Sequence, residues 1–319
     1  MLNIIFMGTP DFAKESLEAI YNAGYNIMSV VTNPDRPSGR GMKLTMSPVK
    51  EFATEKNISV MQPEKIRDIK EELIKQKPDL FCVVAYGKIL PKEILDIPKL
   101  GSINVHGSLL PKYRGAAPIQ WAVINGEKKT GITTMYMDEG MDTGDMILQE
   151  EVSIGENETT GELWNKLSKV GANLLVKTIR QIEDGKANRK KQGADFTMAP
   201  MLSKENAKID WKNKTCDEIK NLIRGLNPIM GAYTMHNGKK IKIWQADKLT
   251  LDQFIQEYPE AKIDVPNGTV IYSDIKNGLY VKANNGIMVI QEVQAENAKR
   301  MPVQEFLRGN KISIGEIFE

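Results

Sequence analysis

The chain has 319 residues, about twice the usual size of one domain, so two domains are expected. A hydrophobic content of 41% and a charged content of 26% are ordinary for globular proteins and exclude a disordered chain or a fibrous repeat. The formal net charge is only +2, so the overall balance demands no polyanionic partner.

Targeting signals and cysteine content indicate the cellular compartment of the protein. The N-terminus has neither the basic start nor the long apolar stretch of a signal peptide, and no run approaches the ~20 apolar residues of a membrane span. Cys82 and Cys216 lie far apart and show no metal-ligand spacing. We therefore expect a cytoplasmic protein without a metal or a disulfide.

The first third alternates short apolar runs with helical patterns. Strands are expected at residues 2–7, 26–32, 58–61, 80–85 and 102–105, and helices after residue 10, at 49–55 and at 66–74. This alternation predicts an α/β fold, a mostly parallel Rossmann-like sheet covered by helices on both faces. The Gly8 turn lacks the further glycines of a dinucleotide fingerprint, which argues against a nicotinamide site.

Residues 33–46 interrupt this alternation. The segment is rich in proline, glycine and positive charge and has no period, so it is interpreted as a long mobile loop. Loops of this length are more often functional than accidental, although a disordered excursion is the alternative.

The end of the first domain is marked by a helix signal. Two strands are expected at 131–137 and 146–153, and Thr159 with Glu162 forms a capping box for a long amphipathic helix that ends near residue 182. We assign residues 1–184 to a catalytic domain and residues 185–206 to a basic linker. The basic run here fits a solvated linker and a polyanion contact equally well.

Residues 207–319 follow a different pattern. After a helix near 216–223, apolar runs are joined by Asn-Gly pairs at 237–238, 267–268, 277–278 and 285–286, which indicate type I′ hairpin turns. The second domain is predicted to be mainly antiparallel, a small OB-like barrel, because closure removes exposed sheet edges.

Chemistry is concentrated after the strand at 102–105. Period-two geometry places Asn104 and His106 on one face, at the carboxyl edge of the parallel sheet where such folds bind ligands. Asp142, in a glycine-flanked turn, is the natural third member, and its charge beside the ring would favour the imidazolium. The alternatives are a packed structural histidine and an ordinary turn aspartate.

Longer motifs carry a family resemblance. Four motifs resemble those of the folate-dependent formyltransferases. They are His106-Gly-Ser-Leu-Leu-Pro-Lys-Tyr-Arg-Gly, Gly8-Thr-Pro-Asp-Phe, Pro34-Asp-Arg-Pro and Gly140-Met-Asp-Thr-Gly. Over the whole chain, the similarity is to the methionyl-tRNA formyltransferase family. The resemblance implies 10-formyltetrahydrofolate as formyl donor and the amino group of methionyl-initiator tRNA as acceptor, in support of translation initiation.

The resemblance also implies roles for particular residues. The catalytic trio would be Asn104, His106 and Asp142, with no metal. The folate site would be lined by Ser108, Leu109, Leu110 and Pro111, and apolar neighbours such as Val84 and Ile89 would suit the pterin.

The acceptor tRNA would meet the 33–46 loop, the linker and the C-terminal barrel. The basic residues that fit phosphate contact are Arg36, Arg40 and Lys43 in the loop and Arg189, Lys190 and Lys191 in the linker. Lys239, Lys240 and Lys242 either extend this track or form a solvated face. We expect a monomer.

Other functions share this site. A sugar-nucleotide N-formyltransferase or a formyltetrahydrofolate hydrolase could use the same trio, and a catalytically silent tRNA-binding module could retain the fold. The basic linker and the added β domain favour a large polyanionic acceptor. A glycinamide ribonucleotide transformylase fits less well, because that family resembles the first domain alone.

Overall fold

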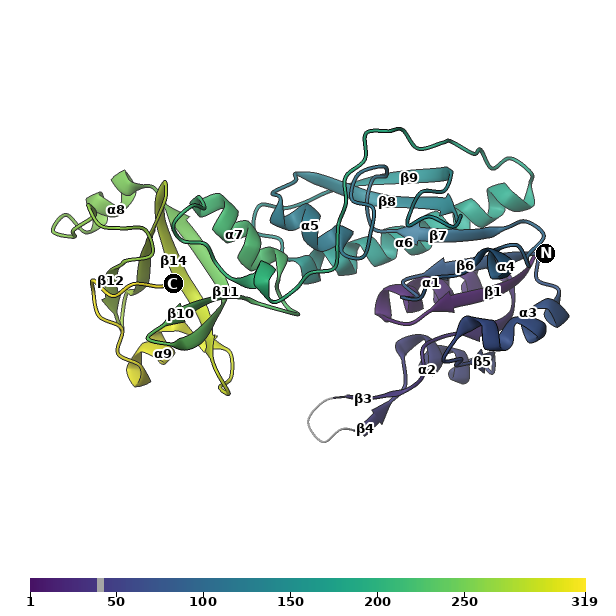
Figure 1. The fold of residues 1–319 in the computed structure, drawn as a ribbon, viewed down its shortest axis with the longest axis horizontal. Helices are drawn as coiled ribbons and strands as arrows, with labels where there is room; N and C mark the ends of the chain where they lie inside the picture. The colour runs from purple at the N-terminus through teal and green to yellow at the C-terminus, as the bar shows by residue number, and fades with distance from the viewer. Residues whose placement is uncertain (39–42) are drawn as a thin grey trace. The chain divides into compact units, whose positions relative to one another are not determined.

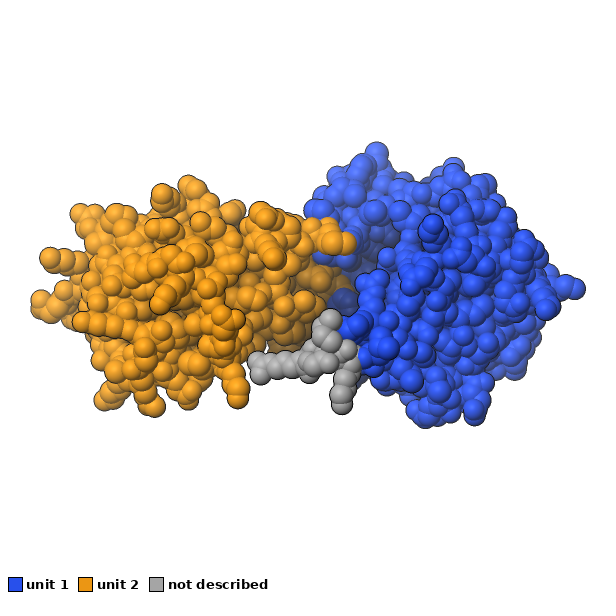
Figure 2. Space-filling model, turned by 60° about the horizontal axis from the view of Figure 1, so that its bottom comes forward, with its two compact units in different colours: residues 1–118, 129–153, 164–200 blue, residues 119–128, 154–163, 201–319 orange. Residues whose placement is uncertain are grey.

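The computed structural model describes residues 1–38 and 43–319. Two units are distinguished, blue and orange in Figure 2. The first comprises residues 1–118, 129–153 and 164–200, and the second comprises residues 119–128, 154–163 and 201–319. No helix in the described residues is long and apolar enough to cross a membrane.

The first unit contains a seven-stranded sheet in the order β5-β2-β1-β6-β7-β8-β9 (Figure 1). The first five strands in this order run parallel, and β8 and β9 are antiparallel to their neighbours. The strands are β1 (Asn3–Gly8), β2 (Asn26–Val31), β5 (Ser59–Met61), β6 (Leu80–Val84), β7 (Ser102–His106), β8 (Lys129–Tyr136) and β9 (Met146–Ser153). The predicted mostly parallel sheet is confirmed.

Helices lie along this sheet because its central strands are apolar on both faces. Ile4, Ile5, Phe6 and Met7 of β1 are all fully buried, as expected for a parallel strand covered on both sides. The helical elements up to residue 183 are α1 (Asp11–Asn22), α2 (Pro48–Glu55), η1 (Ile66–Ile69), α3 (Lys70–Gln76), α4 (Lys92–Leu95), α5 (Pro118–Ile124) and α6 (Thr160–Glu183). Nearly all of α5 and the first residues of α6 are grouped with the second unit.

One cluster packs α3 and α4 against the sheet. It joins Ile5 and Phe81 of the strands to Leu73 of α3 and Ile94 of α4. Towards its middle, α6 approaches β7, where a Cβ added to Gly171 would lie 3.1 Å from Val105. These helices hold the strand that ends at His106.

The predicted capping box of α6 is present. Thr159 Oγ1 accepts from the backbone N–H of Glu162 at 3.3 Å, and the Glu162 carboxylate accepts from the Thr159 backbone N–H at 2.8 Å. The sequence placed this helix boundary correctly because a capping box uses contacts only three residues apart.

The described part of the 33–46 segment contains paired strands. Two short strands, β3 (Arg36–Ser38) and β4 (Lys43–Thr45), pair in antiparallel register. The sequence analysis did not predict these two strands. Proline and glycine obscured the pattern, because three-residue strands are too short to show a period.

The second unit is an antiparallel sheet in the order β10-β11-β14-β13-β12, with β15 paired to β14. Its elements are η2 (Glu205–Ala207), α7 (Cys216–Gly225), β10 (Ala232–His236), β11 (Lys239–Leu249), α8 (Leu251–Glu257), β12 (Val270–Asp274), β13 (Gly278–Ala283), β14 (Gly286–Ala295), β15 (Met301–Pro302) and α9 (Val303–Gly309). The antiparallel prediction is confirmed.

The last residues of the chain join the two edges of this sheet. Glu319 exchanges backbone hydrogen bonds with Met235 of β10, both at 2.9 Å, and Val270 of β12 donates to the Glu316 carbonyl at 2.8 Å. Backbone hydrogen bonds thus connect both edge strands through the C-terminal segment, in the way that closure into a barrel requires.

The four Asn-Gly pairs differ in structure. Asn237 and Gly238 have φ of +49° and +72° and join β10 to β11, as a type I′ turn demands. The pairs at 277–278 and 285–286 lie at hairpins, but neither asparagine has a positive φ. The hairpin predicted at 267–268 is wrong, since α8 and a loop separate β11 from β12.

Two segments of the predicted first domain, residues 119–128 and 154–163, are grouped with the second unit, and Arg224 of α7 binds both. Its guanidinium donates to the carbonyls of Glu158 at 2.9 Å, Gly155 at 3.3 Å and Val123 at 3.5 Å. Burial lowers the pKa of Arg224. These hydrogen bonds connect α7 to both segments. The boundary at residue 184 stays a prediction.

Candidate active site

His106 is the last residue of β7 and is 5% exposed. Its Nε2 lies 2.9 Å from the carbonyl oxygen of Tyr113. A carbonyl only accepts, so Nε2 carries the hydrogen and donates it. This bond fixes the ring and leaves Nδ1 as the nitrogen that can exchange a proton.

Asp142 faces that free nitrogen. Its Oδ2 lies 3.6 Å from Nδ1 of His106 and accepts the backbone N–H of Gly115 at 2.8 Å. The distance to the ring exceeds that of a direct hydrogen bond, whereas the amide contact is a strong one. The two residues that the sequence analysis paired are thus brought together although 36 positions of sequence separate them.

Asn104 occupies the same strand two residues before His106 and is half-buried. Within the described part of the chain, its side-chain amide has no hydrogen-bond partner. The alternation of a strand places it on the face of His106. An unoccupied amide near a fixed imidazole is available to a ligand.

The loop after β7 is held by Thr133 of β8. Its Oγ1 donates to the carbonyl of Ser108 at 2.7 Å and accepts from the N–H of Leu110 at 3.1 Å. The same hydroxyl accepts from Nε2 of Gln149 at 2.9 Å, so its hydrogen-bonding capacity is full. Sequence reasoning missed both Thr133 and Gln149, because their role depends on pairing across the sheet.

The four residues matched to the folate site are not equally accessible. The Ser108 side chain is fully buried and donates to the Lys112 carbonyl at 2.6 Å, and Leu110 is 3% exposed. Leu109 and Pro111 are half-buried. Of the apolar residues named beside them, Val84 is buried in β6 whereas Ile89 is 83% exposed.

Residues 185–200, predicted as a linker, are bound to the first unit. Arg114 exchanges backbone hydrogen bonds with Thr197 and Ala199, at 2.8 and 2.7 Å, and Gln192 donates to the carbonyl of Asp142 at 2.8 Å. These hydrogen bonds tie the segment to Arg114, next to Tyr113, and to Asp142. No sequence signal marks Gln192, because it follows a basic run and lies in a segment without a period.

Asp35 anchors the base of the β3–β4 hairpin. It accepts hydrogen bonds from Lys50 at 2.6 Å and from Gln62 at 2.8 Å. These bonds hold the pKa of the carboxyl below its usual value, with that from Lys50 the largest cause. The Pro-Asp-Arg-Pro motif thereby fixes where the hairpin, with Arg36 at its start, leaves the sheet.

The six basic residues matched to tRNA contact have different surroundings. The side chain of Arg36 is exposed, as are those of Lys190 and Lys191, and Arg189 places its guanidinium 3.7 Å from the centre of the Tyr136 ring. Lys43 begins β4, and Arg40 lies outside the described residues. Lys190 is fixed by two backbone hydrogen bonds to Met146, both at 2.9 Å.

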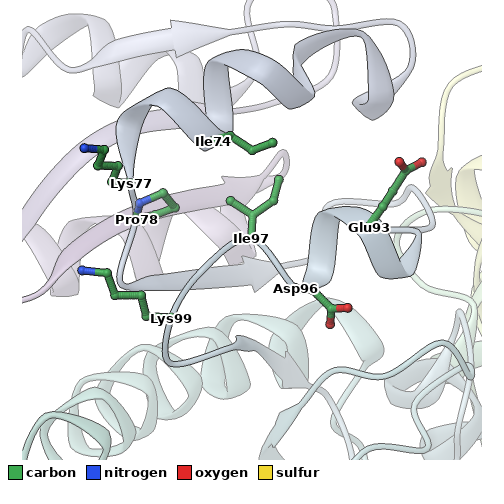
Figure 3. Close-up of a pocket in the computed structure, with 7 residues that line it drawn as sticks. All are labelled: Ile74, Lys77, Pro78, Glu93, Asp96, Ile97 and Lys99. Carbon is green, nitrogen blue, oxygen red and sulfur yellow. The ribbon is translucent and has the colours of Figure 1, made fainter.

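A separate hollow of about 410 Å³ lies at the amino ends of β6 and β7, the opposite edge from His106 (Figure 3). Ile74 and Ile97 extend toward each other there. The full lining is Ile74, Lys77, Pro78, Glu93, Asp96, Ile97 and Lys99. None of the trio takes part in it, so it contributes nothing to the chemistry at His106.

The donor set around His106 does not resemble a metal site. In the described residues, no group of three or more histidine, cysteine, aspartate or glutamate side chains is arranged to hold an ion. The polar groups that converge here are one imidazole, one carboxylate and one amide, a set suited to proton transfer and to binding a developing oxyanion.

Comparison with known proteins defines the class. Residues 2–179 match the family described as formyl transferase, and residues 201–311 match the formyl transferase C-terminal domain. Two solved structures share the fold. The sugar 3N-formyltransferase WlaRD has a TM-score of 0.65 and is 23% identical, with 94% of this chain and 99% of that chain covered. An N-formyltransferase from Helicobacter canadensis has a TM-score of 0.66 and is 22% identical, with 94% of this chain and 100% of that chain covered. The protein is a formyl transferase.

Full-length sequence comparison with curated relatives identifies the family within this class. A methionyl-tRNA formyltransferase of Clostridioides difficile is 51% identical over 98% of this chain and 99% of its own, and one of Clostridium tetani is 49% identical over the full length of both. The chain belongs to the methionyl-tRNA formyltransferase family.

Proposed function

We propose that the protein transfers a formyl group from 10-formyltetrahydrofolate to the amino group of methionyl-initiator tRNA, in support of translation initiation. The full-length relatives support the substrates. The observation that carries the chemistry is the facing pair of His106 Nδ1 and Asp142 Oδ2, 3.6 Å apart at the carboxyl edge of the sheet.

The reaction moves one carbon between two nitrogens. The neutral amine attacks the formyl carbon, a new C–N bond forms, and the carbonyl oxygen of the resulting tetrahedral intermediate carries negative charge. The bond from that carbon to folate N10 then breaks, and N10 takes up a proton equivalent to the one that the amine loses. The site must therefore stabilise an oxyanion and move a proton.

Two side chains are suited to stabilise the oxyanion by hydrogen bonding. The amide of Asn104 has no other partner in the described residues. Nδ1 of His106 is the ring nitrogen not engaged by Tyr113, and it donates a hydrogen bond when the ring is protonated. Donors fixed in position before the reaction stabilise charge without reorganisation. We assign Asn104 and His106 to this role.

Asp142 suits the proton transfer. Its Oδ2 is already held by the Gly115 N–H and lies beyond hydrogen-bonding distance of Nδ1. A water or the attacking amine can therefore lie between the carboxylate and the ring. We assign Asp142 to orient or charge His106 and to help relay the amine proton toward N10.

We assign the binding site of the formyl donor, 10-formyltetrahydrofolate, to the loop after β7. Thr133 and Gln149 fix the backbone of residues 108–111, and Leu109 and Pro111 are the members of this loop that are only half-buried. We assign Ser108, Leu109, Leu110 and Pro111 to the folate site, with the buried pair shaping the loop and the half-buried pair meeting the ligand.

We assign binding of the acceptor, methionyl-initiator tRNA, to basic residues outside the catalytic trio. Arg36, Lys190 and Lys191 are exposed and suited to phosphate contact. Arg189 is exposed and stacked on Tyr136, which fixes its direction. We also retain Arg40 and Lys43, and we assign the tRNA-binding part of the chain to residues 207–319, with residues 1–184 as the catalytic part.

The protein is further proposed to act as a monomer in the cytoplasm. Cys82 and Cys216 are free and buried, which fits a reducing compartment. Burial raises the pKa of the Cys216 thiol to about 11 and raises that of Cys82 as well, so neither is a reactive thiolate.

The function is tested by incubating the protein with 10-formyltetrahydrofolate and methionyl-initiator tRNA, with free methionine and uncharged tRNA as controls. Formylated aminoacyl-tRNA that depends on charged tRNA and on His106 is the expected product. Folate turnover without formylated tRNA would instead indicate a hydrolase or a sugar-amine acceptor. Absence of any formyl transfer would favour the alternative that the protein is a catalytically silent tRNA-binding module.

A further inference from the structure

Gln192 is bound at every polar atom of its side chain, and all its partners lie around the site. Its Nε2 donates to the carbonyls of Asp142 and Gly144, both at 2.8 Å. Its Oε1 accepts from Nε of Arg114 at 2.9 Å. A half-buried amide with this many fixed partners determines the position of the chain segments that it connects.

The turn that carries Asp142 needs such support. Asp142 adopts the left-handed region, with φ of +56°, which is unfavourable for a residue with a Cβ. The backbone at Gly144 is packed so closely that an added Cβ would overlap the Tyr136 carbonyl. A conformation of this kind persists where surrounding contacts hold it in place.

The contacts of Gln192 complete a ring around Asp142. The carboxylate of Asp142 is bound by the N–H of Gly115, and its carbonyl is connected through Gln192 to Arg114, the neighbouring residue. Arg114 is itself 9% exposed and stacks on Phe196 at 4.6 Å. Backbone and side chain of Asp142 are therefore both tied to the loop whose Tyr113 carbonyl fixes His106.

We propose that Gln192 is a positioning residue for formyl transfer, which holds the Asp142 turn so that the carboxylate faces Nδ1 of His106. The inference rests on the proposed role of Asp142. It makes Gln192 the one residue of the segment after α6 to which we give a role in the reaction. A glutamine is required because two N–H groups must reach two carbonyls while one oxygen accepts from Arg114.

Two substitutions separate these contacts. Gln192→Leu removes the hydrogen bonds to Arg114, Asp142 and Gly144 and the weaker contact to Sδ of Met135. Gln192→Glu keeps the length and the acceptor for Arg114 but places an anion against two carbonyl oxygens. Asp195→Asn is the control, since this exposed residue lies in the same segment and is not assigned to the site. Thermal unfolding of each variant establishes that it is folded.

Steady-state formylation is measured with both substrates varied. Both Gln192 variants are expected to lose about 10- to 100-fold in kcat, with KM values within about twofold of the original, because misplacing a catalytic group by an ångström lowers the rate of the chemical step. Asp195→Asn is expected to behave as the original protein. A rise in KM with unchanged kcat would overturn the proposal in favour of a binding role.

Coupling to Asp142 gives the decisive result. In an Asp142→Asn background, Gln192→Glu is expected to change kcat by less than about threefold, because residues that act through one another are not additive. Equal losses in both backgrounds would refute the positioning role. Full activity of Asp142→Asn alone would instead refute the role of Asp142. If Gln192→Leu does not fold, Gln192→Glu decides the question.

Discussion

His106 and Asp142 face each other through Nδ1 and Oδ2 at 3.6 Å, while Nε2 of the same ring donates to the Tyr113 carbonyl at 2.9 Å. The two nitrogens therefore have different functions: one anchors the ring and the other serves the reaction. A histidine fixed by only one nitrogen can donate or accept a proton at the other without moving.

This division is tested by His106→Gln, because a glutamine amide can replace Nε2 as a donor to Tyr113 but has no counterpart of Nδ1. The variant is expected to unfold at nearly the original temperature and to lose roughly 100- to 1,000-fold in kcat, the usual cost of removing an oxyanion donor. Initial rates of formylation measure this loss.

The matched control is His236→Gln, which changes the only other histidine of the chain. His236 lies in the second unit, where its Nε2 is 2.6 Å from the Glu316 carboxylate. Its replacement is expected to leave kcat unchanged. Near-original activity of His106→Gln would show that Nδ1 takes no part in the reaction.

Gly115→Ala is expected to damage both stability and activity. Gly115 has φ of +123°, and an added Cβ would lie 2.7 Å from the Ala199 carbonyl. The strain is expected to cost about 1–3 kcal/mol of the free energy of unfolding. Since the Gly115 N–H also binds Asp142, kcat is expected to fall by more than the loss of folded protein explains.

Gly193→Ala provides the comparison for this variant. Gly193 belongs to the same bound segment as Ala199, but an added Cβ meets nothing within 4 Å. Thermal unfolding and kcat should both stay at the original values. If Gly115→Ala behaves in the same way, then the close approach of residues 185–200 to the site is not required.

The sequence predicted what depends on short-range patterns. Asn104 and His106 share a face because strands alternate with period two, and the capping box places the start of α6. Asp142 was identified from its glycine-flanked turn and the family resemblance. Its distance from His106 was not predictable, since it depends on the register of β8 and β9 against β7.

Contacts between distant segments were missed for the same reason. The Asn-Gly pair at 267–268 predicted a hairpin, yet Gly268 lets the C-terminal segment approach: an added Cβ would lie 2.6 Å from the Phe318 carbonyl. Gln192 gave no local signal because its partners are at positions 114, 142 and 144. Sequence periodicity reports burial within an element and not which loops meet.

Arg224→Leu is expected to destabilise the second unit. Arg224 is 7% exposed and donates to three backbone carbonyls, which the substitution leaves without those partners. Each buried group left without a partner costs about 1–3 kcal/mol, although water can relieve part of this. The expected loss is about 2–4 kcal/mol, measured by denaturant unfolding. Arg308→Leu, at an exposed position in the last turn of α9, should change stability little.

Glu218→Gln should reveal a pH-dependent contribution of α7. Glu218 accepts from Lys214 at 2.7 Å and from the N–H and hydroxyl of Thr215, both at 2.9 Å. These bonds, that from Lys214 first, lower the pKa of Glu218 from 4.5 to about 2. A lowered pKa means that the folded state favours the carboxylate, so the stabilisation is complete above the unfolded value of 4.5 and is lost as pH falls toward 2.

The difference in unfolding temperature between the original protein and Glu218→Gln is therefore expected to be constant from pH 7 to about 5 and to shrink as the pH is lowered further. Its size should be small, because Glu218 is 45% exposed and solvent screens the ion pair. Glu260→Gln, at an exposed position in the same unit, is the control for the loss of one negative charge. A difference that grows on acidification would mean that the capping carboxylate is protonated more readily in the folded state.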